Sequence, residues 1–209
     1  MIILCRSVKG GSGTTVTAAA LALLLAARHR GGGHVVDLHG DLPAALGIAE
    51  PDGTELREVN SSLRLLPRRL GPQPTDSQWL SLVTELSSLR GPVVVDVGNI
   101  VPAASLVDAA AASYLVTRSC YLALRRATGF IHANGTGANH GIDGCILLSE
   151  PGRALSAGDV STVLRVPVRA NVPVEASVSR AVDAGLLAHR VPKSLDEALA
   201  DIIGEHSGR

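Results

Sequence analysis

The residues with the clearest potential for chemistry lie in the stretch KGGSGTT, residues 9–15. Its glycines, Gly10, Gly11 and Gly13, allow a backbone to approach a ligand closely and to adopt turns that other residues avoid. A long apolar run follows, which is typical of a turn that leads into a buried helix. Because the first N–H groups of a helix point at an anion and the helix dipole favours negative charge there, the stretch predicts a phosphate-binding loop.

A hydroxyl and two acids could complete this site with a magnesium ion. Thr15 would stand at the head of the helix, where its hydroxyl can bind the metal. Asp96 closes the apolar stretch VVVD and can hold the ion through water, as a Walker B acid does, while Asp37 ends another apolar stretch. A glycine-rich turn alone is also typical of an ordinary strand–helix connection. It is the position of Asp96 that favours nucleotide chemistry.

Lysine is rare in this chain, which draws attention to Lys9. Of the 19 basic residues, 17 are arginine, and only Lys9 and Lys193 are lysine. Lys9 directly precedes Gly10 and Gly11, so we interpret it as a position that requires a compact ammonium group rather than charge alone. The alternative interpretation is an ordinary surface lysine.

The elements that must position these residues follow from an alternation of apolar runs with helical patterns. Runs that are apolar throughout predict strands buried on both faces, as in a parallel sheet covered by helices. We expect strands at 2–5, 34–38, 62–67, 92–98, 113–117, 144–149 and 166–173, and helices at 15–29, 77–89, 106–112, 121–129, 178–185 and 195–203. The predicted fold class is α/β, a doubly wound and mostly parallel sheet in one domain, residues 1–209. Ligands bind at the carboxyl ends of such strands, where residues 9–15, 37–41 and 96–99 fall.

Composition excludes several other classes of protein. The formal net charge is zero, with 19 acidic and 19 basic residues, so no general attraction to nucleic acid or anionic lipid is expected. The three cysteines, Cys5, Cys120 and Cys145, are few and widely spaced, which indicates buried thiols in a reducing cytoplasm rather than a disulfide framework or metal site. The apolar run 16–27 is shorter than the about 20 residues that span a bilayer, so a buried helix is expected, and no integral membrane segment.

The stretch KGGSGTT resembles the deviant Walker A motif of the ParA/MinD superfamily of P-loop ATPases, K-G-G-x-G-K-[ST]-T. The likeness covers nearly the whole chain: VVDLHGDLPAALGI resembles switch I, VVVDVGN resembles Walker B and switch II, and residues 166–187 resemble the closing segment near the base pocket. It implies a SIMIBI-like P-loop fold, ATP with Mg²⁺ as ligands, and a homodimer in which Lys9 reaches the partner's nucleotide. The implied nucleotide-binding residues are Lys9, Gly10, Gly11, Ser12, Gly13, Thr14, Thr15, Val16, Pro173 and Glu175, and the implied metal-binding residues are Thr15, Asp37 and Asp96.

Two segments resemble one branch of that superfamily, the CpaE/TadZ-type pilus-assembly ATPases. HGDLPAALG is similar to the end of their D-L-D-L-x-x-G-D-L-A-x-x-L-G pattern, shortened by about three residues. LRLLPRRLGP is similar to a segment that they carry before their Walker B helix. The resemblance implies protein partners in a localised assembly such as a pilus or secretion complex.

Two departures from the family pattern decide the expected function. Thr14 occupies the position of the lysine that neutralises phosphate charge, and its loss costs several kcal/mol of charge-assisted hydrogen bonding. His39 occupies the position of the acid that positions the attacking water, a loss on the order of 10² to 10⁴ in rate. Asp37 and Asp41 remain as candidate catalytic acids. We therefore expect a degenerate, pseudo-ATPase member that can bind ATP and Mg²⁺ without requiring either.

Three alternatives stay open. The chain could be an active positioning ATPase in which Lys9 supplies in trans the charge missing at Thr14. It could be a partition protein that binds DNA through arginines near the C-terminus, a hypothesis that the neutral charge balance disfavours; those arginines are Arg165, Arg169, Arg180 and Arg190. A membrane-binding C-terminal helix is disfavoured because its polar face is acidic. We expect that helix to pack on the sheet, and recruitment of the protein to a pole or membrane through its partners.

Overall fold

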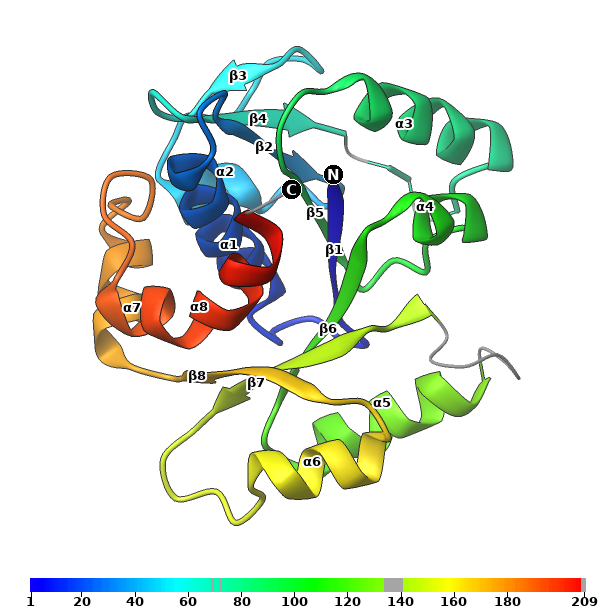
Figure 1. Ribbon diagram of the computed structural model, residues 1–209, viewed down its shortest axis with the longest axis vertical. Coiled ribbons are helices and arrows are strands. Elements are labelled where there is room, and N and C mark those ends of the chain that lie inside the picture. The colour runs from blue at the N-terminus through cyan, green and yellow to red at the C-terminus, as the bar shows by residue number, and fades with distance from the viewer. Residues whose placement is uncertain (69, 72, 134–140, 208–209) are drawn as a thin grey trace.

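The computed structural model describes residues 1–68, 70–71, 73–133 and 141–207. Eight strands form one sheet in the order β3-β4-β2-β5-β1-β6-β7-β8 (Figure 1). Every neighbouring pair is parallel except β3 with β4. The strands are β1 (Ile2–Arg6), β2 (Gly33–Asp37), β3 (Arg57–Glu58), β4 (Leu63–Pro67), β5 (Val93–Gly98), β6 (Ala112–Arg118), β7 (Gly144–Ser149) and β8 (Val168–Pro173). The predicted α/β class with a mostly parallel sheet is confirmed.

Helices cover both faces of this sheet. They are α1 (Thr14–Arg28), α2 (Leu42–Leu46), α3 (Asp76–Ser88), α4 (Ala104–Ala109), α5 (Tyr121–Ala133), α6 (Ala157–Leu164), α7 (Ala176–Asp183) and α8 (Lys193–Ser207). In β1, Ile3 and Cys5 belong to the core that holds α1 and α8, whereas Ile2 and Leu4 belong to the core on the side of α3. Successive side chains of a strand point to opposite faces, so one apolar strand serves both cores.

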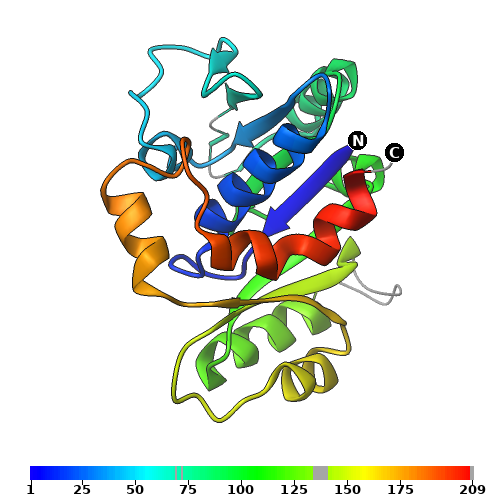
Figure 2. The same cartoon turned by 60° about the vertical axis from the view of Figure 1, so that its left-hand side comes forward.

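Helix α1 is the most buried helix around the phosphate loop. It carries no acidic residue and one basic residue, Arg28, in its last turn, and its buried residues run from Thr14 to Ala26 over almost its whole surface. It contacts β2, β5 and α8, and α8 lies beside it in Figure 2. The small side chains of Ala18, Ala19, Ala20 and Ala22 are buried there, which lets neighbouring elements approach closely. The N-terminus of α1 is therefore fixed by packing at the carboxyl end of the central strand β1.

Helix α8 packs on the sheet, as the sequence predicted. Its apolar residues Leu195, Leu199, Ile202 and Ile203 are all buried against β8 and α1. Near its end the ring of His206 lies edge-on to Tyr114 of β6, with 3.0 Å between the tyrosine hydroxyl and Nε2. No helix in the described ranges is both long and apolar enough to cross a membrane.

Three short elements were not predicted, and several boundaries differ. The missed elements are α2, α6 and β3, and the helix predicted at 106–112 is found two residues earlier, as α4. Helix α2 has five residues with a proline in its first turn, and β3 has two residues on the sheet edge. Helix α6 begins with a capping box between Ser156 and Asp159 and buries only Val160 and Leu164. Elements this short depend on tertiary contacts, so the sequence pattern alone carries little signal for them.

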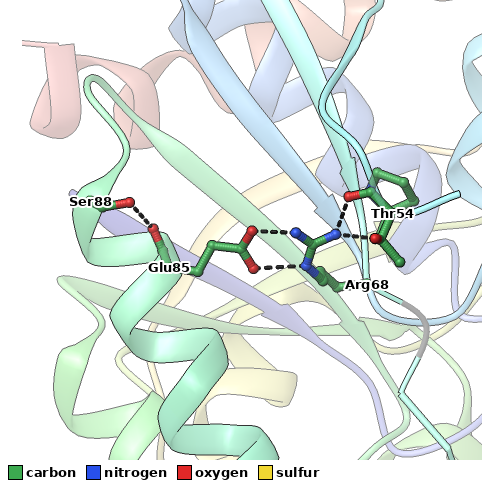
Figure 3. A network of polar contacts seen from close by, with 5 residues as sticks. Thr54, Arg68, Glu85 and Ser88 are labelled. Carbon is green, nitrogen blue, oxygen red and sulfur yellow. Dashed lines mark hydrogen bonds and ion pairs between the residues drawn. The ribbon is translucent and has the colours of Figure 1, made fainter.

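A polar network fastens the segment after β4 to α3. The guanidinium of Arg68 donates from Nε to Oε2 of Glu85 at 2.7 Å and from Nη2 to the other carboxylate oxygen, Oε1. It also donates to the carbonyl oxygens of Thr54 and Pro67 (Figure 3). Such a bidentate pair fixes geometry as well as charge. The segment predicted to be loop, 68–77, is thus anchored at its start, and its end is helical from Asp76 onward; residues 69 and 72 lie outside the described residues.

Candidate functional site

A cavity of about 590 Å³ opens at the carboxyl ends of the central strands. It lies where β1, β2 and β5 each pass into a loop, so the predicted position of the site follows from the strand order. Its lining includes every residue of the predicted loop from Lys9 to Val16, and residues of the loops after β2 and β5. The full lining is Ser7, Lys9, Gly10, Gly11, Ser12, Gly13, Thr14, Thr15, Val16, His39, Asp41, Ala44, Ala45, Gly98, Asn99, Val182 and Asp183.

The loop from β1 to α1 has the backbone that its glycines predict. Gly11 and Gly13 have φ values of 73° and 82°, in the left-handed region that favours glycine. A Cβ atom on Gly13 would also lie 2.4 Å from Cδ2 of Leu148, whereas one on Gly11 would meet nothing within 4 Å. The hydroxyl of Ser12 donates to the carbonyl of Lys9 at 3.0 Å and braces the loop internally. At Gly13 it is therefore the left-handed conformation that requires glycine, because the close atom is the terminal methyl of a flexible leucine side chain.

Thr14 is the first residue of α1 and lies in the wall of the cavity. The residue is 6% exposed, and its buried Oγ1 has no hydrogen-bond partner among the described residues. A buried hydroxyl without a partner costs about 1–3 kcal/mol, and such groups in native proteins call for an explanation.

Asp37 is buried at the end of β2 and organises the loop that follows. Its Oδ1 accepts from the backbone N–H groups of His39 at 3.0 Å and Gly40 at 2.6 Å, and its Oδ2 accepts from Leu42 at 3.1 Å. Both carboxylate oxygens are thus engaged by the loop. Asp41, the other predicted acid, is exposed at the start of α2 and lines the cavity.

Asp96 is fully buried at the end of β5. Its Oδ1 accepts from the N–H of Gly98 at 3.1 Å, and its Oδ2 has no hydrogen-bond partner in the described part of the chain. Burial raises the pKa of this carboxyl from 3.8 to about 6; the nearby hydroxyl of Thr15 opposes the rise, and the charge of Asp37 adds to it. A cation near Oδ2 would remove both the missing partner and the cost of the buried charge.

His39 connects the loop after β2 with the loop after β5. Its Nε2 accepts a hydrogen bond from the backbone N–H of Asn99 at 3.3 Å. The ring lies so close to Gly98 that a Cβ there would be 2.2 Å from Cδ2 of His39, and Gly98 has a φ of 55°. The imidazole therefore acts as a bridge between two loops at the rim of the cavity, and it is exposed to solvent.

A second cavity of about 220 Å³ adjoins the first and shares Gly13, Val16, Val182 and Asp183 with it. Pro173 and Glu175, which the sequence predicted at the base pocket, lie in its wall. Its remaining lining is Thr17, Arg118, Leu148, Val172, Val174, Val178, Ser179 and Leu195. An apolar cavity that continues from a phosphate loop has the character of a base pocket.

Several lining residues escaped the sequence analysis. Arg118 at the end of β6 forms an ion pair with Glu150, which also binds Arg153. Val182 and Asp183 of α7 take part in both cavities. The sequence carries a signal for α7, because residues 166–187 resemble the closing segment near the base pocket. Nothing in the sequence pairs Arg118 with Glu150, 32 residues away.

The predicted magnesium ligands meet in part. No three His, Cys, Asp or Glu residues in the described ranges gather closely enough to hold a metal ion by themselves. Mg²⁺ in nucleotide sites is held by one or two protein groups, with phosphate oxygens and water completing the octahedron. Thr15 and the free Oδ2 of Asp96 fit that requirement, whereas the oxygens of Asp37 already accept three backbone hydrogen bonds.

No protein-family model and no curated protein matches the sequence. Solved structures do match the fold. A chain of the MinC:MinD cell division protein complex of Aquifex aeolicus gives a TM-score of 0.76 at 19% identity, over 100% of this chain and 96% of that chain. A ParA family ATPase from Chlorobium tepidum TLS gives 0.74 at 18% identity, over 97% and 96%.

A third match bears on ligands. The septum site-determining protein MinD of Pyrococcus horikoshii OT3, solved in complex with Mg-ADP, gives a TM-score of 0.73 at 18% identity, over 98% of this chain and 96% of that chain. At identities this low, structural similarity shows the fold alone. The aligned region covers nearly the full length of each chain. The fold of this protein is that of the ParA/MinD P-loop ATPases.

Proposed function

We propose that residues 1–209 form a single ParA/MinD-like domain that binds nucleotide, hydrolyses it weakly or not at all, dimerises, and positions a cellular assembly in the cytoplasm. One observation carries the proposal. The loop keeps the glycine backbone and the helix N-terminus that bind phosphate, but Thr14 presents a buried hydroxyl where the family pattern has a lysine. The site can therefore hold an anion with less charge stabilisation than phosphoryl transfer uses.

The second departure supports weak hydrolysis. The attacking water needs a positioned acceptor, and the carboxylate oxygens of Asp37 are taken by backbone N–H groups. The Nε2 of His39 already accepts a hydrogen bond from the N–H of Asn99. Asp41, the other candidate catalytic acid, is exposed at the N-cap of the short helix α2 and lines the cavity. Catalysis would rest on that carboxylate.

A dimer across the phosphate cavity is supported by what lies around it. Val101 follows β5 and is 60% exposed, and Tyr121 and Leu122 follow β6 and are 74% and 52% exposed. The carboxyl ends of parallel strands share one edge of the sheet, so these apolar side chains lie on the same side as Lys9. In the described part of the chain Lys9 forms no ion pair. Exposed apolar side chains beside an ammonium group that forms no ion pair with the described residues are the features expected of an interface with a second copy of the chain.

The assembly that such a dimer would position is proposed from resemblance. HGDLPAALG and LRLLPRRLGP are similar to segments of pilus-assembly ATPases. In the structure the first spans the Asp37 loop and α2, and the second includes β4 and the anchored Arg68. Recruitment to a pole or membrane would occur through protein partners. DNA binding is not proposed, because the acidic and basic residues of the chain balance.

An active positioning ATPase is the second candidate function, and Lys9, which forms no ion pair with any described residue, favours it. In a dimer that ammonium could supply to the partner's nucleotide the charge missing at Thr14. Both candidate functions predict nucleotide binding. They differ in the expected rate of ATP hydrolysis.

Binding and turnover are tested separately. ATP with Mg²⁺ should raise the melting temperature, since a ligand that binds only the folded state stabilises it. No shift at millimolar ATP and Mg²⁺ would contradict nucleotide binding. Turnover should stay far below the about 10 s⁻¹ of an ordinary enzyme. A rate near that value that is lost in Asp96→Ala would favour the active ATPase. Restoring the lysine by Thr14→Lys should strengthen ATP binding more than it restores hydrolysis, because His39 remains.

A further inference from the structure

A separate hollow of about 540 Å³ is lined by α7, the loop that follows it and the start of α8. These segments lie at the left of Figure 1. We call this hollow the α7–α8 groove. None of its described lining residues lines the phosphate cavity, and only Glu175 also lines the second cavity that adjoins it. The groove is therefore a surface that the proposed nucleotide binding does not use.

The charge of the groove is predominantly positive. Arg180 of α7, Arg190 of the loop and Lys193 of α8 line it. Glu175 is the one carboxylate among its described lining residues, and it accepts a hydrogen bond from the hydroxyl of Ser177 at 3.0 Å. The chain as a whole has equal numbers of acidic and basic residues, so this excess of cations is local to the groove.

The two guanidinium groups of the groove are available to a ligand. Arg180 and Arg190 are exposed, and within the described part of the chain neither forms an ion pair. Lys193 pairs with Glu197 at 3.0 Å, but both side chains are mostly exposed, and such surface pairs are weak. Each guanidinium can bind a carboxylate through two parallel hydrogen bonds. The groove therefore offers two strong sites for carboxylates.

Apolar side chains complete the groove. Leu186, in the loop after α7, is 51% exposed, and Ala181, Ala184 and Pro192 also line the hollow. Exposed apolar side chains together with arginine are characteristic of surfaces that bind other proteins. A ligand that fits this groove must therefore combine negative charge with apolar contact.

The form of the groove favours a peptide over other anionic macromolecules. Duplex DNA and anionic membranes present extended surfaces of phosphate, which bind to broad basic faces. Here the cations line a hollow and share it with apolar side chains. A peptide chain can enter a hollow of this size, and in an extended peptide successive side chains point to opposite sides.

We propose that the α7–α8 groove docks an extended acidic segment of a partner protein. Carboxylates of that segment pair with Arg180 and Arg190, and an apolar side chain of the segment covers Leu186. The docking requires no nucleotide, because the two guanidinium groups lie outside the phosphate cavity and the second cavity.

Fluorescence anisotropy of the full chain with labelled peptides tests the docking. The probe is a short fluorescein-labelled peptide in which Asp and Leu alternate. One control peptide alternates Lys with Leu, which reverses the charge, and another alternates Asp with Ser, which removes the apolar side chains. Because hydrogen bonds between charged groups are among the stronger polar contacts, the Asp–Leu peptide should bind at least about 10-fold more tightly than the Lys–Leu peptide. The Asp–Ser peptide should have intermediate affinity.

Charge reversal at single exposed positions locates the binding. Arg180→Glu and Arg190→Glu should each weaken binding of the Asp–Leu peptide by about 10-fold or more, because repulsion replaces a charged hydrogen bond. Arg190 lies in a loop, so its variant carries no risk to helix α7. Arg126→Glu, at an exposed position of α5, changes the net charge equally and should leave the affinity unchanged.

Three outcomes would overturn the proposal. The first is absence of binding of the Asp–Leu peptide at millimolar concentration, or equal binding of all three peptides. The second is an equal loss of affinity in Arg126→Glu, which would assign the effect to overall charge. The third is binding of labelled duplex DNA or phosphatidylglycerol vesicles that requires Arg180 and Arg190 when the peptide does not bind. The melting temperature in ATP and Mg²⁺ is measured separately, so failure of the docking leaves the proposed nucleotide binding intact.

Discussion

Asp37 and Asp96 are register partners on the neighbouring parallel strands β2 and β5, and both are buried. Among the described residues Asp37 accepts three backbone hydrogen bonds, whereas Asp96 accepts one from the backbone and its Oδ2 has no hydrogen-bond partner. The two carboxyls therefore do different things. One shapes a loop, and the other keeps a free oxygen behind the phosphate cavity, where charge is costly unless a cation is present.

Replacing this carboxyl with an amide should stabilise the metal-free protein at neutral pH. Burial raises the pKa of Asp96 to about 6, above its ordinary value of 3.8. An acid with a raised folded pKa loses stability as the pH rises between the two values, and Asp96→Asn removes that loss. A shift of this size corresponds to about 2–3 kcal/mol, gained above about pH 6 and absent near pH 4. Urea unfolding in EDTA at both pH values measures it.

Asp159 provides a control of opposite sign. Hydrogen bonds from the Ser156 cap lower the pKa of its carboxyl, so its contribution is present at neutral pH and lost as the pH falls. Asp159→Asn should cost stability at neutral pH and cost less in acid. If Asp96→Asn followed the same pattern, the buried carboxylate would have a partner that offsets its burial.

The central strands and the phosphate loop could be predicted because their signals are local. Val93 to Val97 form a continuous buried run, and Gly11 and Gly13 adopt the left-handed backbone that only glycine adopts readily. The strand-end residues then converge by topology. Lys9 to Thr15, His39, Asp41 and Asn99 all reach one cavity, as the parallel order requires.

The rest could not be predicted, because it depends on contacts between distant residues. The His39–Asn99 hydrogen bond joins positions 60 residues apart. Asp37 was expected beside a metal ion, and only the folded loop shows that its oxygens bind the backbone of residues 39, 40 and 42. The five-residue helix α2 is set by its neighbours, including α7, rather than by its own periodicity.

The ends of α2 and α7 meet at two glycines, Gly47 and Gly185, which follow these helices. A methyl group on Gly47 should lower the free energy of unfolding. A Cβ on Gly47 would lie 2.1 Å from the carbonyl oxygen of Gly185, so the backbone would have to move. Gly152 has a similar φ, 78° against 74°, but a Cβ there meets nothing within 4 Å. Gly152→Ala should cost about 1–2 kcal/mol from left-handed strain alone, and Gly47→Ala clearly more.

The same variants should differ in ligand binding. Displacing α7 moves Val182 and Asp183, which line both cavities, so Gly47→Ala should weaken ATP–Mg²⁺ binding while Gly152→Ala leaves it unchanged. Chemical unfolding and calorimetry measure the two effects. Equal losses of stability in the two variants would mean that the contact between Gly47 and Gly185 relaxes freely.

The thiols should differ sharply in reactivity. Burial raises the pKa of Cys5, and it raises that of Cys145 to about 12, so neither forms thiolate in the native state. Cys120 is half-buried, which corrects the expectation that all three thiols are buried. Because the thiolate is the reactive species, a disulfide reagent at about pH 8 should modify one thiol of the native protein and all three after unfolding. Cys120→Ser should abolish the native reaction; a native reaction that persists in this variant would mean that β1 or β7 opens.

Lys9 should matter for self-association. Its position before the glycine turn, and the exposed Val101 and Tyr121 on the same edge, suit an isologous interface in which two phosphate loops face each other around a two-fold axis. Lys9→Ala should weaken dimerisation or its dependence on nucleotide. Lys9→Arg should not fully restore it, because a planar guanidinium fits a crowded glycine turn less well than a compact ammonium. Lys193→Ala is the matched control, since the other lysine of the chain is 88% exposed and pairs with Glu197. Sedimentation of all four proteins with and without ATP and Mg²⁺ decides the matter. A wild type that stays monomeric at high concentration in every nucleotide state would refute the interface and return Lys9 to an ordinary surface lysine.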